Sequence, residues 1–273
     1  MTRFQIIIKY LAIAFAVVLT VSIIGGILSI VGLVGFFGNN SAVAAQMQQY
    51  PVSGEVTRLE LEIHAAELTI EESDSFFVKS NLKDLKVTSK NGTLVIQERD
   101  RLVKNYKGAA LTVGIPKHFR FASAQIETGA GNVEIAALSA DSLSLELGAG
   151  NVTIHKLHAE KSAELEGGAG KITILDGLVR NLQLDMGVGE LNLTAALLGA
   201  SELNLGVGTT NLTLLGTEAD YTVRVEKGVG NTTVNGQSMS NNTTYGSGQN
   251  RVELEGGVGN ILVNIREASM SAQ

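Results

Sequence analysis

The chain has 273 residues, a net charge of −6 and no cysteine, and only 5% of its residues are aromatic. The missing cysteines exclude disulfides, thiolate zinc sites and cysteine nucleophiles, and the acidic balance argues against a nucleic-acid partner. The 31 glycines, 2 prolines and many small branched residues are typical of thin, regularly layered β structure.

The N-terminal part contains a long apolar run. No residue from Tyr10 to Phe37 is charged, and the run exceeds the roughly 20 residues that a membrane-crossing helix needs. Arg3 and Lys9 precede it, which predicts a cytoplasmic N-terminus and an extracellular C-terminal domain. A cleaved signal peptide is the alternative, but the length favours an uncleaved anchor. We expect residues 1–37 to be a cytoplasmic tip and a single-pass anchor in the cell membrane, and residues 38–54 to be a linker.

Residues 55–120 indicate an irregular β region. Asn91-Gly92 separates two strand-like runs and is a strong hairpin signal. The run Leu111–Ile115 is a further strand, which Pro116 ends. We expect this region to cover the first coil of the repeats that follow, because a repeat protein needs an atypical end.

A Gly-x-Gly element recurs along residues 121–273. Its first glycines lie 19, 20, 19, 19, 22 and 29 residues apart, and a period near 20 predicts a solenoid. The elements begin at Gly129, Gly148, Gly168, Gly187, Gly206, Gly228 and Gly257.

Apolar residues alternate with polar ones around each element and change parity across it, as in Leu143–Leu147 and then Val152 and Ile154. The alternation predicts strands, and the parity change predicts a corner made by residues that tolerate positive φ, namely the glycines and the asparagines after them. Two apolar columns follow. The first holds Ile126, Leu145, Leu165, Leu184, Leu203, Val225 and Leu254; the second holds Ile135, Ile154, Ile174, Leu193, Leu212, Val234 and Val263.

These patterns together predict an all-β fold. We expect a parallel β-helix or solenoid, right-handed, with coils of about 20 residues, preceded by one N-terminal transmembrane helix. The polar stretch Gln237–Gln249 is expected to be a surface loop.

The strand Leu111–Pro116 followed by Gln125–Ile135 and its repeats resembles a bacterial adhesin-like family of unknown function with β-strand repeats, DUF4097. The resemblance covers about residues 55–265. It implies a surface location and a β-helix, and it implies no catalytic residues. Some family members are similar to a protein encoded beside regulators of envelope stress.

Several other motifs are weak. The Gly-x-Gly elements lie between strands and do not open a helix, so they do not indicate nucleotide binding. Ile172 and Ile261 stand where a calcium-binding β-roll needs aspartate. His155 and His158 lack further metal ligands nearby in the sequence, and we expect no metal and no cofactor.

One column of carboxylates is the candidate site. It lies three residues before the centre of each Gly-x-Gly and is expected to face outward; its members are Glu127, Glu146, Glu166, Asp185, Glu226 and Glu255, with Asn204 in the remaining coil. The bland interpretation is a solvated face. The functional interpretation is an acidic strip that meets divalent cations, a basic envelope protein or a cationic peptide.

No concave catalytic pocket is suggested, and tryptophan is absent. We therefore expect a membrane-anchored, extracytoplasmic, adhesin-like interaction module and not an enzyme. An accessory protein of envelope-stress sensing is the alternative, and a polysaccharide-cleaving enzyme is a distant third, because it needs acids and bases in a groove bordered by long loops.

Overall fold

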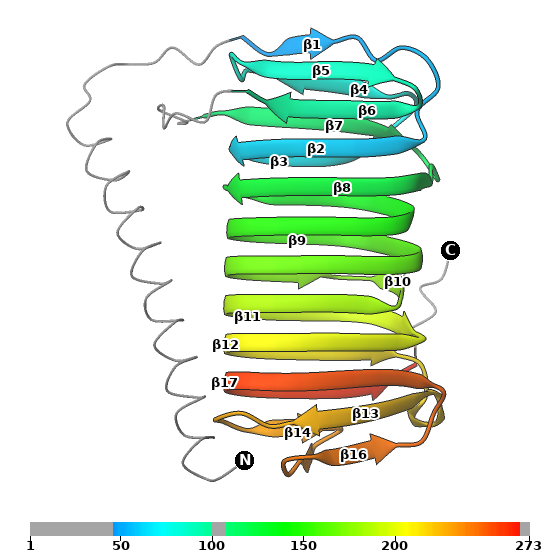
Figure 1. The fold of residues 1–273 in the computed structure, drawn as a ribbon, viewed down its shortest axis with the longest axis vertical. Coiled ribbons are helices and arrows are strands. Elements are labelled where there is room, and N and C mark those ends of the chain that lie inside the picture. Colours follow the sequence, from blue (N-terminus) through cyan, green and yellow to red (C-terminus); the bar gives the residue numbers. More distant parts are fainter. Residues whose placement is uncertain (1–45, 100–107, 268–273) are drawn as a thin grey trace, which may run out of the picture. The chain divides into compact units, whose positions relative to one another are not determined.

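A computed structural model describes residues 46–99 and 108–267. The expected transmembrane anchor, residues 1–37, lies outside them, and no helix of the described part is long and apolar enough to cross a membrane. The described part is all-β apart from a short 3-10 helix, η1 (Glu218–Asp220). Figure 1 shows its strands stacked as successive coils.

The central coils pair in parallel with a constant register. Leu184 lies between Leu165 and Leu203, so that residues 19 positions apart are neighbours across coils, as the glycine period predicts. The strands are β8 (Phe121–Ala130), β9 (Val133–Ile174), β10 (Gly177–Arg180), β11 (Leu182–Leu198), β12 (Ala200–Leu215) and β17 (Asn250–Arg266). The stacked repeat of the prediction is therefore present.

Both predicted apolar columns are buried. Every member of the first column and of the second is at most 2% exposed. Within each coil the two columns come from strands on either side of a Gly-x-Gly corner, so their side chains fill one interior. One coil alone cannot bury its own face, which makes contact between neighbouring coils the main source of stability.

Glycine alone makes the corners. The second glycine of every element has a positive φ, between 137° and 149°. The asparagines that follow were expected to share this role, but Asn132, Asn151, Asn231 and Asn260 are not among the described residues with positive φ. Instead, the Nδ2 of Asn151 reaches the Oδ1 of Asn132 at 3.4 Å, so these side chains link neighbouring coils.

The coils do not stack in the order of the sequence. The final strand, β17, pairs in parallel with β12 on one side and with β13 (Tyr221–Glu226) and β14 (Thr232–Val234) on the other. Leu254 therefore lies between Leu203 and Val225, whereas the sequence columns placed Val225 in the middle. Such non-sequential pairing leaves no trace in a repeat pattern.

The N-terminal end has the same inversion. Strands β2 (Arg58–Ala65) and β3 (Glu67–Ser73) come first in the chain but pair with β8 and β9. Strands β6 (Thr93–Glu98) and β7 (Ala110–Pro116) lie outside them. Each end of the stack is thus finished by a coil that is covalently second from the end.

Antiparallel strands close both ends, which protects the parallel edges from pairing with other chains. At the N-terminal end, β5 (Leu85–Lys90) forms the predicted hairpin with β6, and β4 (Phe77–Ser80) pairs with β7 and with β1 (Gln48–Tyr50). At the other end, β16 (Thr243–Gly246) and β15 (Gln237–Ser238) pair with β13 and β14.

These closing strands revise two expectations. The stretch 237–249 is a pair of short strands in place of a loop, held because Met239 is buried between polar neighbours. The range 38–54, expected to be a linker, contains β1, and Tyr50 packs against the core.

The inverted coil order can be tested by cross-linking, because the chain has no native cysteine. Glu202 and Glu253 are direct neighbours on exposed positions of β12 and β17. Adjacent parallel strands lie about 4.8 Å apart, within disulfide reach. We predict that Glu202→Cys with Glu253→Cys oxidises to an intramolecular disulfide, detected as a gel shift that reductant reverses. The pair Glu202→Cys with Arg224→Cys spans two coils and should stay reduced; the opposite pattern would mean that the coils follow chain order.

Candidate functional site

The predicted carboxylate column lies on one exposed face. Glu127 pairs with Glu146, and Asp185 pairs with Glu166, so like charges stand directly across neighbouring coils. All six predicted carboxylates are exposed. Glu255 precedes Glu226 in space because of the inverted coil order. The sequence therefore predicted the face correctly and the order of its last two members incorrectly.

Two amides interrupt or end this column. Asn204 donates from Nδ2 to the Oδ1 of Asp185 at 2.8 Å and separates Asp185 from Glu255. At the other end Gln97 donates to the Oε2 of Glu62 at 2.7 Å, and Glu62 lies beside Glu127. The column thus extends by one coil beyond the predicted residues.

The middle of the face is electrostatically unbalanced. In the described part of the chain, no cation lies within ion-pair distance of Glu127, Glu146, Glu166 or Asp185. At the C-terminal end, by contrast, Arg224 contacts Glu226 at 3.3 Å and Glu253 at 4.0 Å. Adjacent unpaired carboxylates repel each other, so the four-residue stretch is the part of the face most able to gain from a bound cation. We call Glu127, Glu146, Glu166 and Asp185 the acidic strip.

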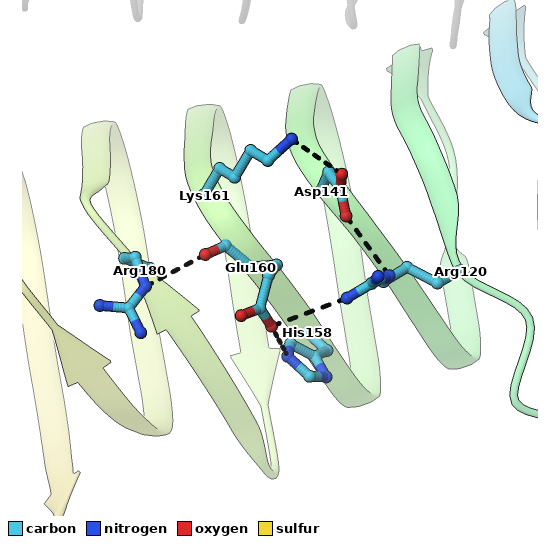
Figure 2. Close-up of polar contacts among 6 residues, drawn as sticks. All are labelled: Arg120, Asp141, His158, Glu160, Lys161 and Arg180. Atoms are coloured by element: carbon cyan, nitrogen blue, oxygen red, sulfur yellow. Dashed lines mark hydrogen bonds and ion pairs between the residues drawn. The ribbon is translucent and has the colours of Figure 1, made fainter.

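A charged network on another side of the stack links three coils (Figure 2). Arg120 Nε lies 3.3 Å from Asp141, and Lys161 Nζ lies 3.0 Å from the same carboxylate. The hydrogen bond from Lys161, together with the charges of Lys161 and Arg120, lowers the pKa of Asp141. Asp141 is 24% exposed, less than its partners, and so is the centre of the network.

Glu160 joins the same network from the next coil. Its carboxylate lies 3.1 Å from His158 Nε2 and 3.9 Å from Arg120, while Arg180 donates to its backbone oxygen (Figure 2). Every charge here meets an opposite charge or a carbonyl, so the network fastens neighbouring coils and leaves little free charge for a ligand.

The histidines considered as metal ligands have separate partners. His155 contacts Glu134, and His158 contacts Glu160. Within residues 46–99 and 108–267, no group of three or more His, Asp or Glu side chains is placed to hold a metal ion. The arrangement is that of two surface ion pairs.

The structure also has a groove that the sequence did not suggest. It has a volume of about 1000 Å³ and runs past the end of β7 to the end of β12; its apolar lining includes Ile115, Phe119, Leu138, Leu157, Leu178 and Leu215. A signal existed, because Leu175 and Leu178 are 49% and 37% exposed where the alternation leads one to expect polar residues.

Taken together, the geometry is that of an all-β repeat protein with long regular faces. The model of the Toastrack DUF4097 family matches residues 78–264, about two thirds of the chain. The chain therefore belongs to this family.

Solved structures show the same fold. A candidate adhesin of Bacteroides fragilis has 20% identity and a TM-score of 0.54, with 80% of this chain and 96% of that chain covered. A candidate adhesin of Parabacteroides distasonis has 14% identity and a TM-score of 0.44, covering 81% and 97%. A candidate cell adhesion protein of Clostridium sporogenes has 18% identity and a TM-score of 0.32, covering 81% and 99%. No curated protein matches the chain.

The charged network has a testable pH dependence. Because folding lowers the pKa of Asp141, its contribution is complete above the ordinary aspartate value of about 3.9 and is lost as the pH falls through the lowered value. We predict that Asp141→Asn lowers the melting temperature by about 2 °C at neutral pH and has no effect in strong acid. Asp176→Asn, at an exposed carboxylate without an ion pair, is the control; a loss at Asp141 that is constant with pH would contradict this role.

Proposed function

We propose that the protein is a membrane-anchored, extracytoplasmic β-solenoid that acts as a non-catalytic, adhesin-like interaction module. The uncharged run from Tyr10 to Phe37 supports an anchor, and the two cations before it support an external domain. The solenoid is right-handed in this proposal, following the general bias of parallel crossover connections.

The acidic strip is the observation that carries the proposed mode of binding. Four carboxylates without cationic partners stand in line on a strand face, at a spacing of about 4.8 Å. A regular, exposed row of like charge suits a partner that repeats opposite charge, such as a cationic peptide segment, or divalent cations bound between neighbours. It does not resemble a general acid–base pair, which needs a substrate held between the two groups.

Binding follows from relief of repulsion. Each carboxylate of the strip is destabilised by its neighbours in the free protein, and a polycation brought alongside replaces that repulsion with attraction. Because all four side chains are exposed, salt should weaken the interaction strongly.

Isothermal titration calorimetry with an oligolysine peptide and with calcium tests the proposal. We predict that Glu146→Gln, Glu166→Gln and Asp185→Asn together weaken peptide binding at least tenfold at low salt, since three of four charges are removed.

A matched control removes three exposed carboxylates elsewhere, Glu71→Gln, Asp176→Asn and Glu267→Gln, and keeps the same net charge change. The control should retain binding. Equal losses in both triple variants would reduce the effect to net charge, and absence of binding by the unmodified protein would reject the strip as an interaction surface.

A further inference from the structure

The closing layer at the N-terminal end differs in charge from the rest of the stack. Residues 74–92, which contain β4 and β5, carry four lysines and two aspartates, whereas residues 121–267 carry 8 Lys and Arg against 17 Asp and Glu. We propose that this end of the stack docks on an anionic phospholipid surface through Lys79, Lys83, Lys86 and Lys90. The inference rests on the membrane anchor proposed above.

The four lysines surround the outermost layer. Lys86 and Lys90 alternate along β5 with Leu85, which is buried, so their side chains point away from the core. Lys79 lies on β4 beside Gln49 of β1, and its Nζ lies 4.6 Å from the ring of Phe77. Lys83 is exposed in the turn between these strands. Long lysine side chains at such a rim can extend their ammonium groups past the last strand toward a surface.

These lysines are also unpaired. In the described part of the chain none of the four has a carboxylate within ion-pair distance, whereas Arg120, Lys161, Lys171 and Arg224 on the repeats each contact one. Unpaired cations keep their attraction for an external anionic surface. Of the two nearby acids, Asp84 already has a partner.

The chain enters the fold at this same end. Strand β1 is the first described element and belongs to the closing layer (Figure 1). Only 10 residues, 38–47, separate it from the end of the uncharged run. Ten residues span at most about 35 Å, so an inserted anchor would hold the lysines near the bilayer and raise their effective concentration there.

The repeats reinforce this orientation. The acidic strip and its neighbours carry a net negative charge and are repelled by the same anionic surface. A bilayer therefore attracts one end of the stack and repels its long acidic face, which leaves that face directed away from the membrane and open to a partner.

Energy transfer from the protein to the lipid surface tests the proposal. The full chain carries one dye at Thr88→Cys on β5, which is unambiguous because no other cysteine exists, and is reconstituted into nanodiscs of phosphatidylcholine alone or mixed with phosphatidylglycerol, with acceptor dye on the lipid. We expect higher transfer with phosphatidylglycerol, and loss of the difference in high salt.

Charge variants make the test specific. Lys79→Gln, Lys83→Gln, Lys86→Gln and Lys90→Gln together should abolish the dependence on phosphatidylglycerol, at about fivefold in the ratio of docked to undocked protein for each lysine. The control Lys156→Gln, Lys227→Gln, Arg251→Gln and Arg266→Gln removes the same charge from distant coils and should keep it.

The outcomes separate this inference from the anchor itself. Chain that alkaline carbonate extracts from membranes is not inserted, and that result overturns the anchor. Chain that stays inserted but shows equal transfer in both lipids, or loses the difference in the control variant as well, overturns the docking surface and leaves the anchor standing.

Discussion

The structure depends on close approach of the backbone at one corner of every coil. The second glycine of each Gly-x-Gly lies in a left-handed conformation against the backbone of the preceding coil, and a Cβ at Gly189 would overlap the carbonyl oxygen of Gly170. Glycine is the residue that satisfies both the positive φ and the missing space. This contact fixes the spacing of the coils, and the spacing in turn aligns Leu184 with its neighbours inside and Asp185 with its neighbours outside.

The candidate surfaces are consequences of that alignment. A register that stacks leucines inside must stack whatever residue follows them outside, so a sequence that places carboxylates there produces the acidic strip. The same regularity cannot continue at the ends, where antiparallel strands replace the next coil. The lysines of the N-terminal layer lie on those strands, so the charge asymmetry of the protein coincides with the boundary between repeat and closing layer.

Much of this was predictable from local patterns. Alternation identified Leu145 and Ile154 as core, the Asn91-Gly92 turn identified a hairpin, and the parity of Glu146 identified an exposed face. What could not be predicted depends on non-local pairing. The intercalation of β17 between β12 and β13 is invisible because all coils share one pattern, and Leu254 fits either position. The groove was missed because it is formed by side chains from several coils, none of which is unusual alone.

The most direct test compares two glycines of positive φ. Gly189 has a φ of 147° and faces backbone, whereas Gly236 has a φ of 76° and no atom within 4 Å of an added Cβ. Chemical denaturation should show that Gly236→Ala lowers the free energy of unfolding by about 1 kcal/mol, and that Gly189→Ala lowers it by about 3 kcal/mol or more because a coil must shift. Equal losses at the two positions would mean that conformation alone selects glycine and that the corner contact does not set the fold.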